Sequence, residues 1–261
     1  MQVWYMNGAG NDFMVIDARG LPLDFPKLAV SLCRRTHADG FLAVDNSEIA
    51  DFKLHFYNSN GLRGEMCGNG ARCVCHFAYA HGIAGERMTV ETDAGLLYAW
   101  RCGENRYRIK LNNPGLVDLQ RLETVSYVEL GNPGIPHAVR EIPDLDWENR
   151  EALRPLALGI RHDTAFPKGV NVNFYRILDR QTLRILTFER GVEDYTLACG
   201  TGSASVAVVL WEKGLLKQGT VAVENPGGTL SITIEGTKEI EALFLEGETQ
   251  LVEQLEITDT P

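Results

Sequence analysis

The feature that most constrains this chain of 261 residues is an internal duplication. The segments 66–71 and 198–203 share the pattern Cys-Gly-x-Gly, and their cysteines are Cys67 and Cys199. The two cysteines lie 132 residues apart, about half the chain. The flanking matches are Phe56 with Phe188 at the same offset and, after a slip of one residue, Val90 with Val223 and Gly95 with Gly228. A repeated motif with matching flanks on both sides indicates two copies of one folding unit.

Both halves show the same order of expected elements. In the first half, alternating or β-rich segments predict strands near 2–6, 13–17, 41–45, 52–57, 87–92, 95–101 and 105–112. In the second half, they predict strands near 125–130, 136–141, 171–177, 183–189, 219–224, 229–234 and 240–246. Helical patterns lie near 27–35, 67–82, 148–160 and 199–214. Each half is therefore expected to contain two strands, a helix, two strands, a second helix and further strands.

The second helix of each half indicates how the strands are arranged. Residues 204–211 are apolar on nearly every face, and such a helix must be enclosed by other elements. Gly82 and Gly214 are suited to end the two helices, because glycine accepts a left-handed conformation. The sequence predicts an α/β (α+β) fold of two pseudosymmetric domains, each a curled, mostly antiparallel sheet around a central helix. We expect domains at 1–117 and 118–261, with last strands that can cross back to the first domain.

The overall charge narrows the set of partners. The chain has 35 acidic and 25 basic side chains and a formal net charge of −10, which argues against nucleic acid or an anionic membrane surface as the main partner. It has no run of about 18 apolar residues, as a membrane span requires. Its first residues lack the basic region and apolar core of a signal peptide. These features predict a cytoplasmic location.

The six cysteines fall into two groups. Without a secretion signal, a disulfide framework is the weaker interpretation. We expect the first group to be small buried packing residues, namely Cys33, Cys73, Cys75 and Cys102. Cys67 and Cys199 differ, because each begins a predicted helix and is followed by Gly-x-Gly. The unpaired amides of a helix N-terminus can bind a carboxylate or phosphate, and the same helix end lowers the pKa of a thiol.

Two activated sulfurs suggest a specific reaction. If the halves face each other, the sulfurs flank one bound acid, so one removes a proton from a carbon and the other returns a proton to its opposite face. For an amino acid, the helix-end amides would stabilise charge that develops on the carboxylate. Nothing in the sequence suggests a pyridoxal or nicotinamide site, and the segment Gly8-Ala9-Gly10 is a poor dinucleotide signal because it precedes no clear helix.

Other interpretations of the cysteines remain open. Cys67, Cys73, Cys75 and His76 could suggest a metal cluster, but positions 73 and 75 lie about 200° apart on a helix. A Cys–His hydrolase leaves the duplicated cysteine unexplained. A redox pair lacks a Cys-x-x-Cys motif, and a purely structural role does not account for the two glycines after each cysteine.

Several motifs, in order along the whole chain, resemble the diaminopimelate epimerase family. These motifs are Gly10-Asn11-Asp12-Phe13, Phe56-Tyr57-Asn58, Met66-Cys67-Gly68-Asn69-Gly70-Ala71-Arg72-Cys73, Pro136-His137-Ala138-Val139, Phe166-Pro167-x-x-Val170-Asn171-Val172, Glu189-Arg190-Gly191 and Ala198-Cys199-Gly200-Thr201-Gly202. The resemblance implies two pseudosymmetric domains with the active site in the cleft between them. It also implies cofactor-independent epimerisation of an amino acid in lysine biosynthesis, and a homodimer.

The resemblance assigns roles to individual residues. It implies that Cys67 and Cys199 form the base and acid pair, and that His137 and Glu189 assist the thiols. The implied substrate-binding residues are Asn11, Asn58, Gly68, Asn69, Asn171, Glu189, Arg190, Gly200 and Thr201. Among them, Arg190 has a guanidinium that can donate two parallel hydrogen bonds to a second carboxylate.

The sequence departs from the family pattern at two positions. Ile135 stands where the family commonly has an asparagine that contacts the distal end of the substrate, and Asn7 stands where histidine is frequent. Asn132 is a candidate to compensate for Ile135, or the distal pocket accepts another side chain. We therefore expect epimerisation of LL- to meso-diaminopimelate, with racemisation of another amino acid such as histidine as the alternative. A noncatalytic amino-acid-binding protein or a thiol redox protein is a third interpretation.

Overall fold

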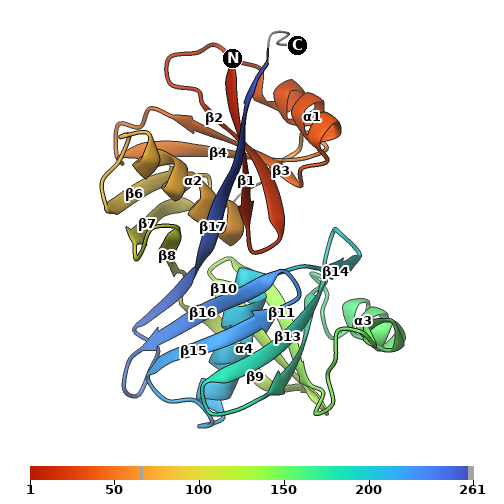
Figure 1. Cartoon of the computed structure of the whole chain (residues 1–261). Coiled ribbons are helices and arrows are strands. Elements are labelled where there is room, and N and C mark those ends of the chain that lie inside the picture. Colours follow the sequence, from red (N-terminus) through yellow and green to blue (C-terminus); the bar gives the residue numbers. More distant parts are fainter. Residues whose placement is uncertain (65–66, 258–261) are drawn as a thin grey trace. The chain divides into compact units, whose positions relative to one another are not determined.

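The structure is a computed structural model that describes residues 1–64 and 67–257 (Figure 1). It divides into two compact units, one formed by Met1–Lys110 with the chain from Glu246 onward, the other by Leu111–Leu245. The last strand thus begins in the second unit and returns to the first. Met66, the first residue of one copy of the repeated motif, lies outside the described residues.

The first unit is a mixed sheet with two helices. Its elements are β1 (Gln2–Gly8), β2 (Asn11–Asp17), α1 (Phe25–Thr36), β3 (Gly40–Asp45), β4 (Phe52–Asn58), β5 (Arg63–Gly64), α2 (Gly68–Ala80), β6 (Arg87–Thr92), β7 (Gly95–Arg101) and β8 (Arg106–Leu111). Strand β17 (Ala242–Glu256) pairs with both β1 and β8. The pairs β2–β3 and β4–β6 are parallel, and β1–β2, β3–β4 and β6–β7 are antiparallel.

The second unit repeats this arrangement. Its elements are β9 (Pro114–Leu122), β10 (Val125–Gly131), β11 (Gly134–Glu141), a 3₁₀ turn (Arg150–Leu153), α3 (Arg154–Arg161), β12 (Asn171–Ile177), β13 (Thr182–Glu189), β14 (Asp194–Thr196), α4 (Gly200–Glu212), β15 (Gly219–Asn225) and β16 (Gly228–Glu235). The pairs β11–β12 and β13–β15 are parallel, and β10–β11, β12–β13 and β15–β16 are antiparallel. The mixed, strand-rich α/β fold expected from the duplication is confirmed.

The two central helices, α2 and α4, are enclosed as the sequence predicts. Helix α2 packs against β1–β4 and β7, and α4 against β9–β12 and β16. Every residue from Gly202 to Leu210 in α4 is buried. Gly82 and Gly214 follow the helix ends with φ of 66° and 72°, in the left-handed region. Within the described residues, no helix has the length and apolar character needed to cross a membrane.

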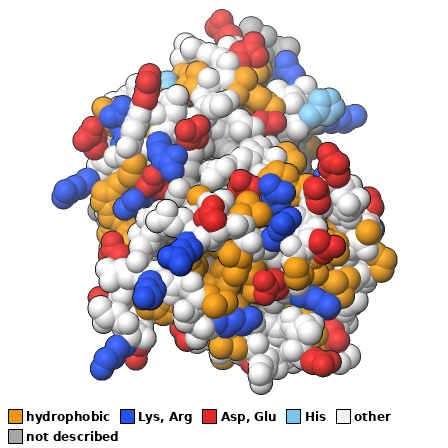
Figure 2. All heavy atoms as spheres, turned by 60° about the horizontal axis from the view of Figure 1, so that its bottom comes forward, with side chains coloured by type: hydrophobic (Ala, Val, Ile, Leu, Met, Phe, Trp, Pro, Cys, Tyr) orange, Lys and Arg blue, Asp and Glu red, His pale blue; other side chains and the backbone are white. Residues whose placement is uncertain are grey.

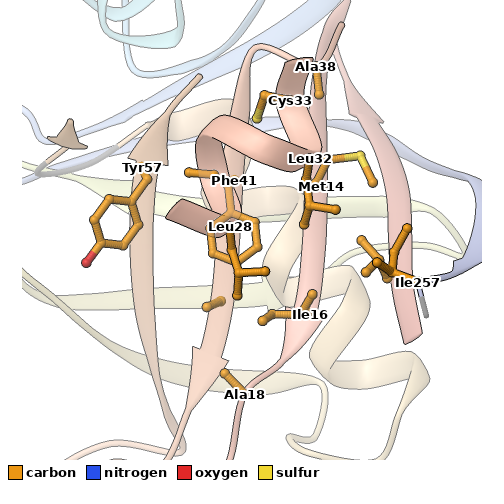
Figure 3. Close-up of a cluster of buried hydrophobic side chains, with 13 residues drawn as sticks. Met14, Ile16, Ala18, Leu28, Leu32, Cys33, Ala38, Phe41, Tyr57 and Ile257 are labelled. Atoms are coloured by element: carbon orange, nitrogen blue, oxygen red, sulfur yellow. The ribbon is translucent and has the colours of Figure 1, made fainter. Parts of the chain in front are cut away.

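The outer helices cover the opposite face of each sheet. In the first unit, Leu28 and Leu32 of α1 join a buried cluster with Phe41 of β3 (Figure 3). The next residue of β3, Leu42, instead contacts α2 near Gly70. Side chains alternate between the faces of a strand, so β3 is buried on both sides and is apolar from Gly40 to Val44. In the second unit, α3 joins a corresponding cluster with strands β12 and β13.

Four expectations need correction. The sequence predicts no strand between 112 and 125, but strand β9 lies there and pairs with β10. Strand β17 continues to Glu256 instead of ending at 246, because pairing with β1 holds a segment rich in glutamate in the sheet. The short strands β5 and β14 add to the predicted set. Cys102 is exposed in the turn between β7 and β8 and is not a packing residue.

The surface carries both signs of charge. Figure 2 shows Lys and Arg side chains interspersed with Asp and Glu over the face in view. Many acidic groups are neutralised locally by ion pairs, such as Lys53–Glu91 in the first unit and Arg184–Glu224 in the second. Both pairs bridge parallel strands of the repeated fold, β4 with β6 and β13 with β15.

Candidate active site

Cys67 occupies the N-cap position of helix α2. Its backbone is extended, with φ −131° and ψ 119°, and its side chain is partly exposed. The helical ladder begins where the Ala71 N–H donates to the Cys67 carbonyl at 2.8 Å. The amides of Gly68, Asn69 and Gly70 therefore precede the ladder, at the positive end of the helix dipole. This end of α2 is suited to a carboxylate.

A polar network ties the start of α2 to the β1–β2 hairpin. The buried Asn69 donates from Nδ2 to Oδ1 of Asn11 at 2.6 Å, and Asn11 donates in turn to Asp39 at 3.1 Å. Arg72 donates to Oδ1 of Asn69 at 2.9 Å. Gly8 permits this approach, because a Cβ there would lie 2.9 Å from Sγ of Cys73 and 3.0 Å from the Asn69 carbonyl. The structure thus brings two sequence-predicted residues, Asn11 and Asn69, to the helix that Cys67 begins.

Asn58 has a more local role in this structure. It ends strand β4 with an exposed side chain, and both its backbone N–H and its Nδ2 donate to the Leu62 carbonyl, at 2.9 and 3.4 Å. These bonds close the turn between β4 and β5. The hydrogen bonds that join Asn11 to Asn69 do not extend to Asn58, whose place in substrate binding stays a prediction.

Cys199 is the N-cap of helix α4 and is more deeply buried than Cys67, at 9% exposure. Its sulfur accepts a hydrogen bond from the Gly202 N–H at 3.3 Å and lies 3.5 Å from the Thr201 hydroxyl oxygen. Its carbonyl accepts from Ser203 N–H at 2.9 Å, which starts the helical ladder. Hydrogen bonds donated to a thiolate favour the charged form, so this end of α4 is built to hold a negative sulfur.

His137 lies at the centre of a buried network behind α4. Asn173 Nδ2 lies 3.1 Å from His137 Nδ1 and also donates to the Ala138 and Asn171 carbonyls at 3.0 and 3.2 Å. An amide nitrogen can only donate, so Nδ1 of His137 accepts and the proton of the neutral ring lies on Nε2. Burial, with a smaller contribution from the charge of Arg190, lowers the pKa of His137 to about 3. His137 is therefore a neutral N–H donor at physiological pH.

Asn171 connects this network to Arg190. Asn171 pairs with His137 across the parallel β11–β12 ladder, and its Oδ1 accepts from the Arg190 N–H at 2.9 Å. Arg190 is exposed and donates from its guanidinium to the Lys168 carbonyl at 2.6 Å. Glu189 is the last residue of β13 and is partly exposed. The second unit thus gathers His137, Asn171 and Arg190.

Sequence reasoning missed two positions that the structure makes central. Asn173 holds His137 and accepts from the Thr187 hydroxyl at 3.0 Å, and Arg72 binds the first turn of α2. The alternation Asn171-x-Asn173 could have identified the first, because residues two apart share a strand face. Arg72 belongs to the motif that contains Cys67, but the motif alone does not show that the arginine side chain is buried.

The remaining buried cysteines are kept protonated. Burial raises the pKa of Cys33 and of Cys75 to about 12 and raises that of Cys73 even further. Among the described residues, no group of three His, Cys, Asp or Glu side chains is placed to hold a metal ion. His76 shares a hydrogen bond of 2.9 Å with Thr249.

The fold is shared with solved racemases and epimerases. A Bacillus anthracis phenazine biosynthesis protein of the PhzF family superposes with a TM-score of 0.79 at 15% identity, covering 99% of each chain. A probable proline racemase from Agrobacterium radiobacter gives a TM-score of 0.73 at 16% identity, covering 98% of this chain and 92% of the other. At these identities the likeness shows the fold alone.

Sequence comparison defines the family within that fold. The family model for diaminopimelate epimerase matches residues 3–114 and 130–252. The diaminopimelate epimerase of Aquifex aeolicus is 36% identical, covering 95% of this chain and 94% of the relative. That of Chlorobaculum tepidum is 36% identical, with coverage of 97% and 100%. The chain belongs to the diaminopimelate epimerase family and is an isomerase.

Proposed function

We propose that this protein interconverts LL- and meso-diaminopimelate by a two-thiol mechanism without a cofactor. The observation that carries the proposal is the duplicated half-site, in which a cysteine caps a glycine-rich helix N-terminus once in each unit. Membership of the diaminopimelate epimerase family supports the substrate. The domain halves 1–117 and 118–261, a homodimeric assembly and a cytoplasmic location are part of the same proposal.

The proposed reaction moves two different protons, one in each of two steps. A thiolate on one face removes the α-proton and becomes a thiol, and the bond electrons remain on the α-carbon and its carboxylate. The thiol on the other face then donates its proton to that carbon and becomes a thiolate, which inverts the centre. Amides of Asn69 and Gly70, and of Gly200 and Thr201, support the carboxylate as its charge grows. Reversal exchanges the roles of the two sulfurs.

Other residues have distinct proposed roles. His137 and Glu189 assist the two thiols. His137 acts as a neutral Nε2–H donor, and Glu189 acts as a carboxylate. Asn11, Asn58 and Asn171 hold polar groups of the substrate, with Gly68 beside the reacting carboxylate. Arg190 pairs with the distal carboxylate, since its fork matches the two oxygens, while Glu189 can meet an ammonium group.

Deuterium exchange tests the mechanism. In heavy water with diaminopimelate, the wild-type protein should incorporate deuterium at the α-carbon as it inverts the centre, as NMR and mass spectrometry can follow. Cys67→Ser and Cys199→Ser should each reduce inversion by at least about 100-fold, because general acid–base groups contribute about 10² to 10⁴ in rate. Cys102→Ser is the matched control and should behave as wild type. Wild-type exchange rates in both active-site variants would refute the two-thiol proposal.

A substrate panel tests specificity. The partly buried Ile135 lies in β11 opposite Leu130, and its apolar side chain makes no hydrogen bond to a distal carboxylate. Comparing diaminopimelate with histidine, lysine and glutamate measures whether a doubly charged substrate is preferred. Inversion of histidine in preference to diaminopimelate would favour the alternative racemase activity.

A further inference from the structure

Arg72 is a fully buried cation in the first half-site. It lies on α2, five residues after Cys67, and its side chain has 0% exposure. The guanidinium folds back toward the start of its own helix, where Nη1 donates to the Gly68 carbonyl at 3.1 Å and Nη2 to Asn69 Oδ1 at 2.9 Å. This is the positive end of the helix dipole, where a cation is disfavoured. The position therefore needs a compensating interaction.

Neither of these acceptors carries a charge. Within residues 1–64 and 67–257, no carboxylate lies within ion-pair distance of Arg72, and its buried Nε has no hydrogen-bond partner. A buried charge without an opposite charge strongly destabilises a folded protein. The positive charge of Arg106 opposes that of Arg72, and Asp12 on the β1–β2 hairpin acts on the neighbouring Cys73. Asp12 and Asp39 are occupied by hydrogen bonds with the hairpin itself.

Three thiols lie close enough to act electrostatically on the guanidinium, and only one of them is suited to ionise. Burial lowers the pKa of Arg72, whereas negative charge on Cys73, Cys67 or Cys75 would raise it. Cys73 and Cys75 have 0% exposure and raised pKa values, so they remain neutral. Cys67 is partly exposed at the N-cap, directly before the two residues that Arg72 binds.

The duplication supplies an internal comparison. Counting from each cysteine, the residue of α4 that corresponds to Arg72 is Ala204, which is also fully buried. The repeated fold therefore accepts alanine at this position. Cys199 in that unit accepts the Gly202 N–H, whereas Cys67 makes no such capping bond to the α2 amides. Of the two equivalent positions, the one in α2 therefore carries a buried cation and the one in α4 a small apolar side chain.

We propose that Arg72 is the buried counter-charge of the Cys67 thiolate. It is a positioning residue, because it acts through the sulfur and through Asn69 and does not touch the substrate. The two half-sites then hold a negative sulfur by different means, one with a guanidinium and the other with a helix amide and a hydroxyl. This inference rests on the proposed function for its role in catalysis, but the charge interaction can be tested without turnover.

The test measures the pH dependence of Cys67 alkylation by iodoacetamide, with peptide mapping to separate the cysteines. In Arg72→Ala, the midpoint for Cys67 should rise by about 1 to 3 pH units, because an opposite charge within reach of a thiol lowers its pKa by about that much. Arg72→Lys should remain near the wild-type midpoint, since it retains the charge. Arg72→Gln repeats the comparison with a side chain that keeps a donor, should the alanine variant not fold.

Two controls separate charge from structure. Arg106→Gln removes a cation in the same region that is paired with Glu246, and it should not raise the Cys67 midpoint. The Cys199 midpoint should stay constant throughout, and Cys73 and Cys75 should remain unreactive if the unit is folded. The proposal would be overturned if the Cys67 midpoint were unchanged in both Arg72→Ala and Arg72→Gln. It would also be overturned if Arg72→Lys raised the midpoint as much as these neutral variants do. If the Cys67 alkylation midpoints shifted as expected but the protein did not incorporate deuterium into diaminopimelate, the proposed function would be refuted and the Arg72 proposal would stand.

Discussion

At the scale of single residues, the second unit keeps one histidine neutral in its interior. His137 has 0% exposure, and Asn173 fixes its Nδ1 as an acceptor while donating to two carbonyls. An imidazolium at this place would lose its hydration and would face the positive charge of Arg190. The side chain therefore presents a fixed Nε2–H donor over the physiological pH range. In this state His137 can donate a hydrogen bond to a thiolate, but it adds no positive charge beside Arg190.

The depressed pKa of His137 predicts a loss of stability in acid. The pKa of His137 is about 3 in the folded protein and 6.5 ordinarily. Between these two pH values, the unfolded chain therefore binds a proton at this histidine that the folded protein does not bind. The stabilisation is fully present above pH 6.5 and is lost as the pH falls toward 3. Between pH 7 and pH 5, wild type should lose about 2 kcal/mol more unfolding free energy than His137→Gln. Urea unfolding at both pH values measures this, and equal losses would show that His137 is protonated in the folded protein.

At the scale of elements, the second glycine of each repeated motif serves a different contact. A Cβ at Gly202 would collide with Oδ1 of Asn173, the residue that holds His137. A Cβ at Gly70 would instead meet Leu42 at 3.2 Å and Phe13 at 3.4 Å, which are apolar side chains able to adjust. The same sequence pattern therefore provides helix–sheet packing in one unit and access for a polar network in the other.

This difference predicts unequal effects of two matched substitutions. Gly202→Ala should destabilise the protein by about 1 to 3 kcal/mol, as overpacking of a rigid core does, and should displace Asn173 from His137. Gly70→Ala should have the smaller effect, because its neighbours can shift by a few tenths of an ångström and alanine favours the helix. Denaturant unfolding and the NMR signals of His137 measure both. An equal loss of stability in the two variants would contradict this account.

The same contrast explains what could be predicted from the sequence. The enclosed helices and most strands follow from local apolar pattern, and the duplication shows that the order repeats. Strand β9 and the continuation of β17 beyond 246 were missed because polar residues alternate in them. The continuation of β17 also depends on pairing with the distant strand β1. The cysteines, Asn11, Asn69 and His137 stand in recognisable motifs. The burial of Arg72 is a tertiary property that no local pattern encodes. The alternation Asn171-x-Asn173 places Asn173 on a shared strand face, but it does not show that Asn173 contacts His137.

At the scale of the whole molecule, the net charge of −10 has no direct part in the proposed site. In the proposed site, negative charge is held by two helix N-termini and by individual cations, Arg72 and Arg190, which act over short distances. Surface charges are screened beyond about 8 to 10 Å at physiological ionic strength. A negatively charged substrate can therefore be recognised locally by a protein that repels polyanions overall.

The two-thiol mechanism also predicts sensitivity to oxidation. Two sulfurs that act on opposite faces of one carbon must come close enough, when no substrate separates them, for a disulfide to form between Cys67 and Cys199. Diamide should abolish inversion, dithiothreitol should restore it, and saturating diaminopimelate should slow the loss. Non-reducing peptide mapping should show the Cys67–Cys199 linkage. Cys102→Ser should be inactivated like wild type, because this exposed thiol lies in the β7–β8 turn. Full activity after both thiols are oxidised would mean that the sulfurs do not share one substrate carbon.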